Sequence, residues 1–120
     1  MALRTITTDL CFAEGPRWYD GALWFSDMHD HVVCRIDADG RKTVVAEVPQ
    51  QPSGLGWLPD GRLLIVSMRD RSILVQNAHG LELWCDLSPL TKHDCNDMVV
   101  DALGRCWVGN FGFDLHAGDA

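Results

Sequence analysis

Three features are missing from this 120-residue sequence: a basic stripe, a membrane-spanning apolar run and a closely spaced cysteine pair. Its 10 Lys and Arg are scattered among 17 Asp and Glu, and the net charge is −7, so a nucleic acid backbone is not an expected partner. No stretch approaches the ~18 apolar residues that a membrane helix needs, and the first residues do not resemble a signal peptide. We therefore expect no nucleic acid and no membrane as partner.

The cysteines are odd in number and widely separated, which argues against a disulfide framework and a zinc knuckle. We interpret them as reduced, mostly buried thiols, and this predicts a cytoplasmic protein. The five are Cys11, Cys34, Cys85, Cys95 and Cys106.

Sustained helical periodicity is also absent, although 47% of the residues are apolar. A repeat is present instead. Each unit consists of a short apolar strand, a turn with glycine, and a second apolar strand; the turn glycines Gly21, Gly61 and Gly104 lie 40 and 43 residues apart. Asp-Gly in the first two turns favours β-hairpins, because glycine adopts positive φ at little steric cost.

Two further hairpins are predicted between the units, around Asp37–Gly40 and Asn77–Gly80. Four strands per repeat of about forty residues are typical of a β-propeller blade. The sequence thus predicts an all-β fold, with residues 1–120 forming about two and a half blades as the N-terminal part of a single propeller domain. A Greek-key sandwich is the alternative.

The repeat also predicts where polar side chains meet. Aligning Trp18, Trp57 and Val100 places Glu14, Ser53 and Asn96 at one position of three successive blades, where we expect them to converge at the channel mouth. Carboxylate and amide oxygens suit a hard cation such as Ca²⁺, which takes about six to eight oxygen ligands. Each residue also has an interpretation without a metal: Glu14 as an ordinary loop carboxylate, and Asn96 as the residue that begins an Asx turn.

Four sequence runs, in order, resemble the gluconolactonase, regucalcin and luciferin-regenerating enzyme family (senescence marker protein-like). The resemblance implies a six-bladed propeller in complete members and hydrolysis of sugar lactones or related carboxylic esters with one divalent metal in the channel. The runs are Cys11–Trp18, Leu23–Asp27, Pro52–Leu64 and Cys95–Arg105.

By the same resemblance, Glu14 corresponds to the first metal-binding carboxylate, and Asn96 corresponds to an asparagine that contacts metal and substrate. Asp114 corresponds to an acidic substrate contact, whereas Asp94 stands where the family often has a substrate-binding arginine. The cation is expected to be calcium, with zinc, manganese or magnesium as alternatives. The remaining ligands and the general base are expected beyond residue 120, so the chain alone should be inactive.

Other catalytic groups have less support. No Gly-x-Ser-x-Gly elbow is present, and we interpret Cys95 as a packed thiol rather than a nucleophile. His93 could line the channel mouth, although a loop histidine is the commoner case; the other histidines, His29, His31, His79 and His116, are scattered.

The sequence therefore predicts a metal-dependent hydrolase of a small sugar-acid lactone, present as part of a longer enzyme. A non-catalytic propeller that serves as a binding scaffold is the second hypothesis, because a fold alone does not determine chemistry. In a third, the short chain associates with copies of itself through unpaired blade edges.

Overall fold

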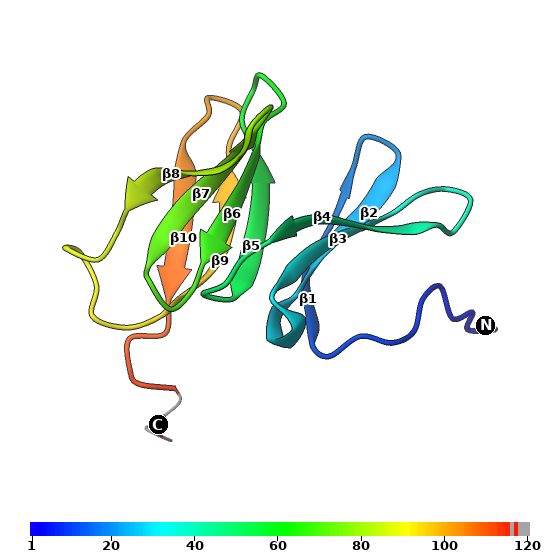
Figure 1. The fold of residues 1–120 in the computed structure, drawn as a ribbon, viewed down its shortest axis with the longest axis horizontal. Helices are drawn as coiled ribbons and strands as arrows, with labels where there is room; N and C mark the ends of the chain where they lie inside the picture. Colours follow the sequence, from blue (N-terminus) through cyan, green and yellow to red (C-terminus); the bar gives the residue numbers. More distant parts are fainter. Residues whose placement is uncertain (116, 118–120) are drawn as a thin grey trace.

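The computed structural model describes residues 1–115 and 117, which form antiparallel strands and one short 3-10 turn (Figure 1). The elements are β1 (Ala13–Tyr19), β2 (Ala22–Asp27), η1 (Met28–Asp30), β3 (Val32–Ile36), β4 (Lys42–Glu47), β5 (Pro52–Trp57), β6 (Leu63–Ser67), β7 (Ser72–Asn77), β8 (Gly80–Asp86), β9 (Cys95–Val100) and β10 (Cys106–Asn110).

The strands form three sheets in chain order. The first sheet has the order β1-β2-β3-β4, the second β5-β6-β7-β8, and the third pairs β9 with β10. Every pairing is antiparallel between consecutive strands. The prediction of an all-β fold with two four-stranded blades and half of a third is confirmed. We call the sheets blades 1, 2 and 3.

The predicted hairpin turns are present, with positive φ at Gly21 (73°), Gly61 (91°) and Gly104 (80°). Aspartate side chains stabilise two of these turns by accepting hydrogen bonds from the turn's own backbone. The Asp60 carboxylate accepts the backbone N–H of Arg62, and the Asp101 carboxylate accepts those of Leu103 and Arg105. Such side-chain acceptors favour a turn over a continued strand.

Two apolar layers hold the blades together, and β6 contributes to both. Leu63 and Ile65 pack between blades 1 and 2, whereas Leu64 and Val66 pack between blades 2 and 3. This division follows from the alternation of side chains along a strand. Burying one such side chain stabilises the fold by about 1.5–3 kcal/mol, so the central blade is held from both sides.

The alignment of Trp18 with Trp57 also holds in space. Trp18 pairs with Leu23 across the hairpin, and Trp57 pairs with Leu63 in the same way. Trp57 packs in the layer against blade 1 and stacks on Tyr19 at 4.0 Å, whereas Trp18 is 72% exposed. Among the described residues no blade covers the face of blade 1 that carries Trp18.

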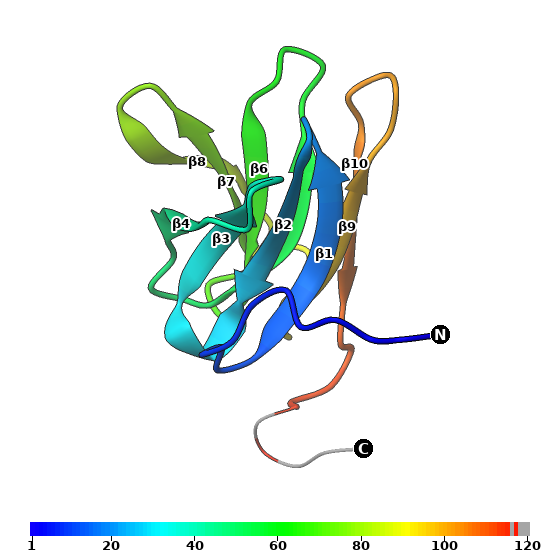
Figure 2. The same cartoon turned by 90° about the vertical axis from the view of Figure 1, so that its right-hand side faces the viewer.

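The opposite end of the blade stack also exposes apolar side chains. Val99 and Trp107 are cross-strand partners on β9 and β10, and both are more than half exposed. Figure 2 shows β1 of blade 1 and the pair β9 and β10 of blade 3, and the inner strand β5 of blade 2 contacts both β1 and β9. The three blades therefore present an uncovered apolar face at each end.

Candidate metal centre

Glu14, Ser53 and Asn96 occupy the same place in three neighbouring strands. Each is the second residue of its strand, in β1, β5 and β9 respectively, and β5 contacts both of the other strands. The register that the repeat predicted is thus present. The three residues lie inside the inner strands, one position after the start of each.

Two glycines allow the inner strands to approach this closely. Gly15 follows Glu14 with φ of 61° at an irregularity in the β1–β2 pairing, and a Cβ there would lie 3.1 Å from the Ser53 carbonyl oxygen. A Cβ on Gly54 would overlap the backbone nitrogen of Met98 and lie 2.8 Å from the carbonyl carbon of Asp97. The main chains of β1, β5 and β9 therefore touch directly around the candidate residues.

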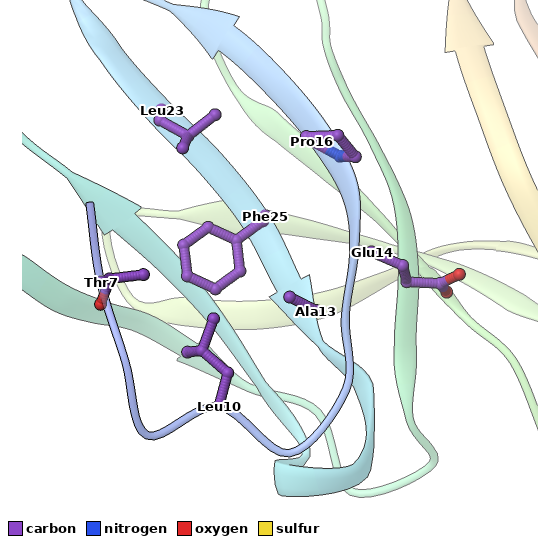
Figure 3. A pocket seen from close by; sticks show the side chains of 7 residues that line it. All are labelled: Thr7, Leu10, Ala13, Glu14, Pro16, Leu23 and Phe25. Atoms are coloured by element: carbon purple, nitrogen blue, oxygen red, sulfur yellow. The ribbon is translucent and has the colours of Figure 1, made fainter. Parts of the chain in front are cut away.

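Glu14 presents a buried carboxylate oxygen without a partner. Its Oε1 atom is buried and has no hydrogen-bond partner within the described chain. Figure 3 shows the carboxylate pointing away from an apolar pocket of about 180 Å³ to which Glu14 also contributes, with Leu10, Leu23 and Phe25 among its other lining residues. An unpaired buried carboxylate is costly unless a cation or a donor meets it. This property fits a metal ligand.

Asn96 is held by a hydrogen bond from blade 2. The Ser53 hydroxyl donates to Asn96 Oδ1 at 3.0 Å, and Ser53 is 1% exposed. The fully buried Ser26 of β2 in turn donates to the Ser53 carbonyl oxygen at 2.6 Å. A hydrogen-bonded chain thus runs from blade 1 through blade 2 to Asn96.

An ion pair joins blade 1 to blade 3 beside these residues. Arg17 of β1 donates from Nη2 to Asp97 Oδ1 at 2.6 Å and to the Met98 carbonyl oxygen at 2.9 Å. Three other ion pairs, Arg35–Asp37, Arg62–Asp60 and Arg105–Asp101, join residues two to four positions apart, whereas Arg17 and Asp97 are 80 apart. The ion pair therefore connects the two strands that carry Glu14 and Asn96.

Asp114 lies with Asp94 in a separate polar cavity of about 190 Å³. Lys92 and His93 also line this cavity, and His93 lies in the loop that precedes β9. Asn96 is not among the residues that line this cavity. His116 lies outside the described residues.

Cys95 has the features of a packed thiol. It is buried in the layer between blades 2 and 3, and burial raises the pKa of its thiol, with nearby Asp94 and Asp70 acting in the same direction and Arg71 against it. A raised pKa disfavours the thiolate that a nucleophile requires. The interpretation of Cys95 as a structural residue therefore agrees with the structure.

The site lacks a complete metal shell within the described residues. No group of three or more His, Cys, Asp and Glu side chains there could hold a metal ion. Glu14 and Asn96 supply one carboxylate and one amide oxygen, a donor set suited to a hard cation but too small for it. The described residues also contain no helix long and apolar enough to cross a membrane.

Sequence comparison decides the family. Residues 12–120 match the profile of the SMP-30/gluconolactonase/LRE-like region. The chain belongs to this family. No curated protein matches it in sequence.

Solved structures support the same fold. A gluconolactonase from Xanthomonas campestris is 23% identical, with a TM-score of 0.79 over 91% of this chain. A virginiamycin B lyase from Staphylococcus aureus is 22% identical, with a TM-score of 0.63 over 78% of this chain. A protein provisionally described as a gluconolactonase is 26% identical, with a TM-score of 0.60 over 83% of this chain. The 120-residue chain covers only 38%, 32% and 40% of the lengths of these three proteins, respectively.

Sequence reasoning located Ser53 but gave it no role, and it missed Ser26 and the Arg17–Asp97 pair. One signal was available for Ser26: it is a small polar residue in the otherwise apolar run Leu23–Ser26. For Arg17 and Asp97 the sequence offers no such signal, because their contact depends on how three strands stack.

Proposed function

We propose that the chain contributes Glu14 and Asn96 to a single divalent cation in a hydrolase that opens a small lactone, with a sugar-acid lactone as the substrate class. The observation that carries the proposal is the buried, unpartnered Oε1 atom of Glu14, at the same strand position as Asn96. Calcium is the proposed cation, and zinc, manganese and magnesium are the alternatives to be tested. Membership in the family supports the lactonase class.

When bound, such a cation polarises the lactone carbonyl and lowers the pKa of a water molecule. Glu14 would hold it with a carboxylate that has one buried, unpartnered oxygen, and Asn96 would add a neutral oxygen and a contact to substrate. Asp114, in its polar cavity near the start of β9, would accept a hydrogen bond from a substrate hydroxyl. The remaining ligands and the general base would come from residues outside this chain's span, which is 38% of the Xanthomonas enzyme's length.

A non-catalytic binding propeller is the second candidate, because the described residues contain no complete catalytic set. In either case the expected partner is a small molecule, and the net charge of −7 makes nucleic acid an unsuitable one. We further propose a cytoplasmic location, supported by five free cysteines, and self-association of this chain through its uncovered blade faces.

The experiment that tests the proposal replaces Glu14 by Gln in the full-length gene product. Metal content is measured by atomic spectroscopy, and hydrolysis of gluconolactone is followed by proton release. We expect Glu14→Gln to lose bound metal and at least about 100-fold in turnover, because the amide keeps the shape but lacks the charge. Glu47→Gln, at the exposed last residue of β4, is the matched control and should leave both unchanged.

Three outcomes separate the candidates. Loss of metal and turnover together supports the hydrolase. Loss of metal without measurable turnover in either protein supports the binding scaffold. Unchanged metal content and turnover in Glu14→Gln would refute the assignment of Glu14.

A further inference from the structure

We infer that Ser53 is a positioning residue that holds the Asn96 side chain for the cation, with Ser26 holding Ser53 in turn; this inference rests on the proposed function. Its basis is the hydrogen-bonded chain that crosses three blades, from the Ser26 hydroxyl to the Ser53 carbonyl and from the Ser53 hydroxyl to Asn96 Oδ1. Each serine contributes one donor, and each donor has a defined acceptor.

The first step of the argument concerns the amide oxygen of Asn96. A carbonyl oxygen has two lone pairs, and Ser53 occupies one of them at 3.0 Å. The second lone pair stays available for a cation. Because Asn96 is only half-buried while Ser53 is buried, the hydroxyl meets the amide from the protein side and leaves its other side open. Outer hydrogen bonds of this kind orient metal-binding side chains.

The second step concerns the rigidity of Ser53. Its carbonyl oxygen accepts the Ser26 hydroxyl and lies where a Cβ on Gly15 would be only 3.1 Å away. On its other side, Gly54 brings β5 into direct contact with the main chain of Asp97 and Met98. Ser53 is therefore fixed between the strand that carries Glu14 and the strand that carries Asn96. A ligand supported from such a rigid element keeps its geometry.

The third step separates positioning from packing. An alanine at position 53 would fill nearly the same volume, and the apolar layers on both sides of blade 2 already hold the blades together. A buried hydroxyl carries a desolvation cost that its hydrogen bond to Asn96 offsets. The hydroxyl is thus explained by what it does to Asn96.

The test compares Ser53→Ala with Ser72→Ala in the full-length gene product. Ser72 is the matched control, because it is also a buried serine of blade 2, and its hydroxyl bonds Asp70. Calorimetry with Ca²⁺, and then with Zn²⁺, Mn²⁺ and Mg²⁺, measures cation affinity, and thermal melting in chelator measures stability without metal. We expect Ser53→Ala to weaken cation binding about 10–100-fold and Ser72→Ala to leave it unchanged.

A double-variant measurement isolates the contact. In an Asn96→Ala background, removing the Ser53 hydroxyl should cause no further loss of affinity, because its acceptor is absent. If Ser53→Ala does not fold, Ser53→Cys keeps the volume with a weaker donor, and an intermediate loss is expected.

The outcomes also distinguish this inference from the proposed function. Wild-type cation binding that Glu14→Gln abolishes but Ser53→Ala changes less than twofold overturns the role of Ser53 alone. A wild-type protein that binds none of the four cations overturns both proposals. Equal losses of affinity in Ser53→Ala and Ser72→Ala would mean that a general loss of stability is responsible, and this too overturns the positioning role.

Discussion

At the scale of single residues, Asp27 shows how a buried charge can serve the fold. It is 2% exposed. Its two carboxylate oxygens share the backbone N–H of Cys11, at 3.0 and 3.1 Å, and Oδ1 also accepts the backbone N–H of Phe12 at 2.6 Å. These bonds attach the segment before β1 to the end of β2. Asp27 and Glu14 thus contrast: one buried carboxylate has its oxygens satisfied by the chain, and the other has an oxygen without a partner.

Replacing Asp27 by Ala should destabilise the protein by about 2 kcal/mol, since two partly buried N–H groups lose their acceptor. Urea unfolding of the full-length gene product measures this cost, and limited proteolysis before β1 should become faster. Asp27→Asn keeps one acceptor oxygen and is expected to lose less. Equal stability of wild type and Asp27→Ala would contradict the role of Asp27 as an anchor.

At the scale of elements, the inner strands β1, β5 and β9 are the part of each blade that sets the site. Their spacing depends on glycine at positions 15 and 54, where main chains meet without intervening side chains. The apolar layers farther out determine that blades stack, whereas these two glycines determine how close the inner strands come. Stability and site geometry therefore depend on different residues of the same strands.

The substitution Gly54→Ala tests this division. Its Cβ would overlap the main chain of β9, so we expect a loss of about 3 kcal/mol or more together with weaker cation binding. Gly109→Ala on β10 is the control, because its Cβ would meet nothing nearer than 3.9 Å. Denaturant melts and calorimetry provide the two measurements. A Gly54→Ala protein as stable as Gly109→Ala would show that β5 and β9 can separate without cost.

Much of this architecture could be predicted from the sequence, because it depends on local signals. Apolar alternation and turn glycines repeat at nearly constant spacing, and they predict the strands, the blades and the shared position of Glu14, Ser53 and Asn96. The contacts between blades could not be predicted in this way. Arg17 reaches Asp97 across 80 residues, and irregular pairing next to Gly15 and Gly54 sets which side chains meet.

At the scale of the whole molecule, the described residues form a stack of blades with both end faces uncovered. Trp18 lies on one end face, and Val99 and Trp107 lie on the other. Exposed apolar surfaces of this kind, together with unpaired strand edges, favour association between chains. The two end faces differ, so copies would join head to tail rather than face to face.

The 120-residue chain expressed alone should therefore exceed its monomer mass of 13.4 kDa in light scattering. Trp107→Glu should lower the measured mass, because a charge on the end face opposes burial. Leu90→Glu, at an exposed loop position outside that sheet, is the matched control and should not lower it. A well-folded monomer of the unmodified chain would contradict the expected association.

Because β6 contributes side chains to both apolar layers, it limits which insertions and deletions the chain can accept during evolution. Leu63 and Leu64 are neighbours in sequence but serve opposite interfaces. Deleting one residue within β6 would exchange the two sets of side chains and disturb both interfaces at once. Gain or loss of an entire blade preserves the alternation in every remaining strand. We therefore expect this architecture to tolerate the insertion or deletion of a whole blade, and to tolerate the insertion or deletion of a single residue mainly in the turns.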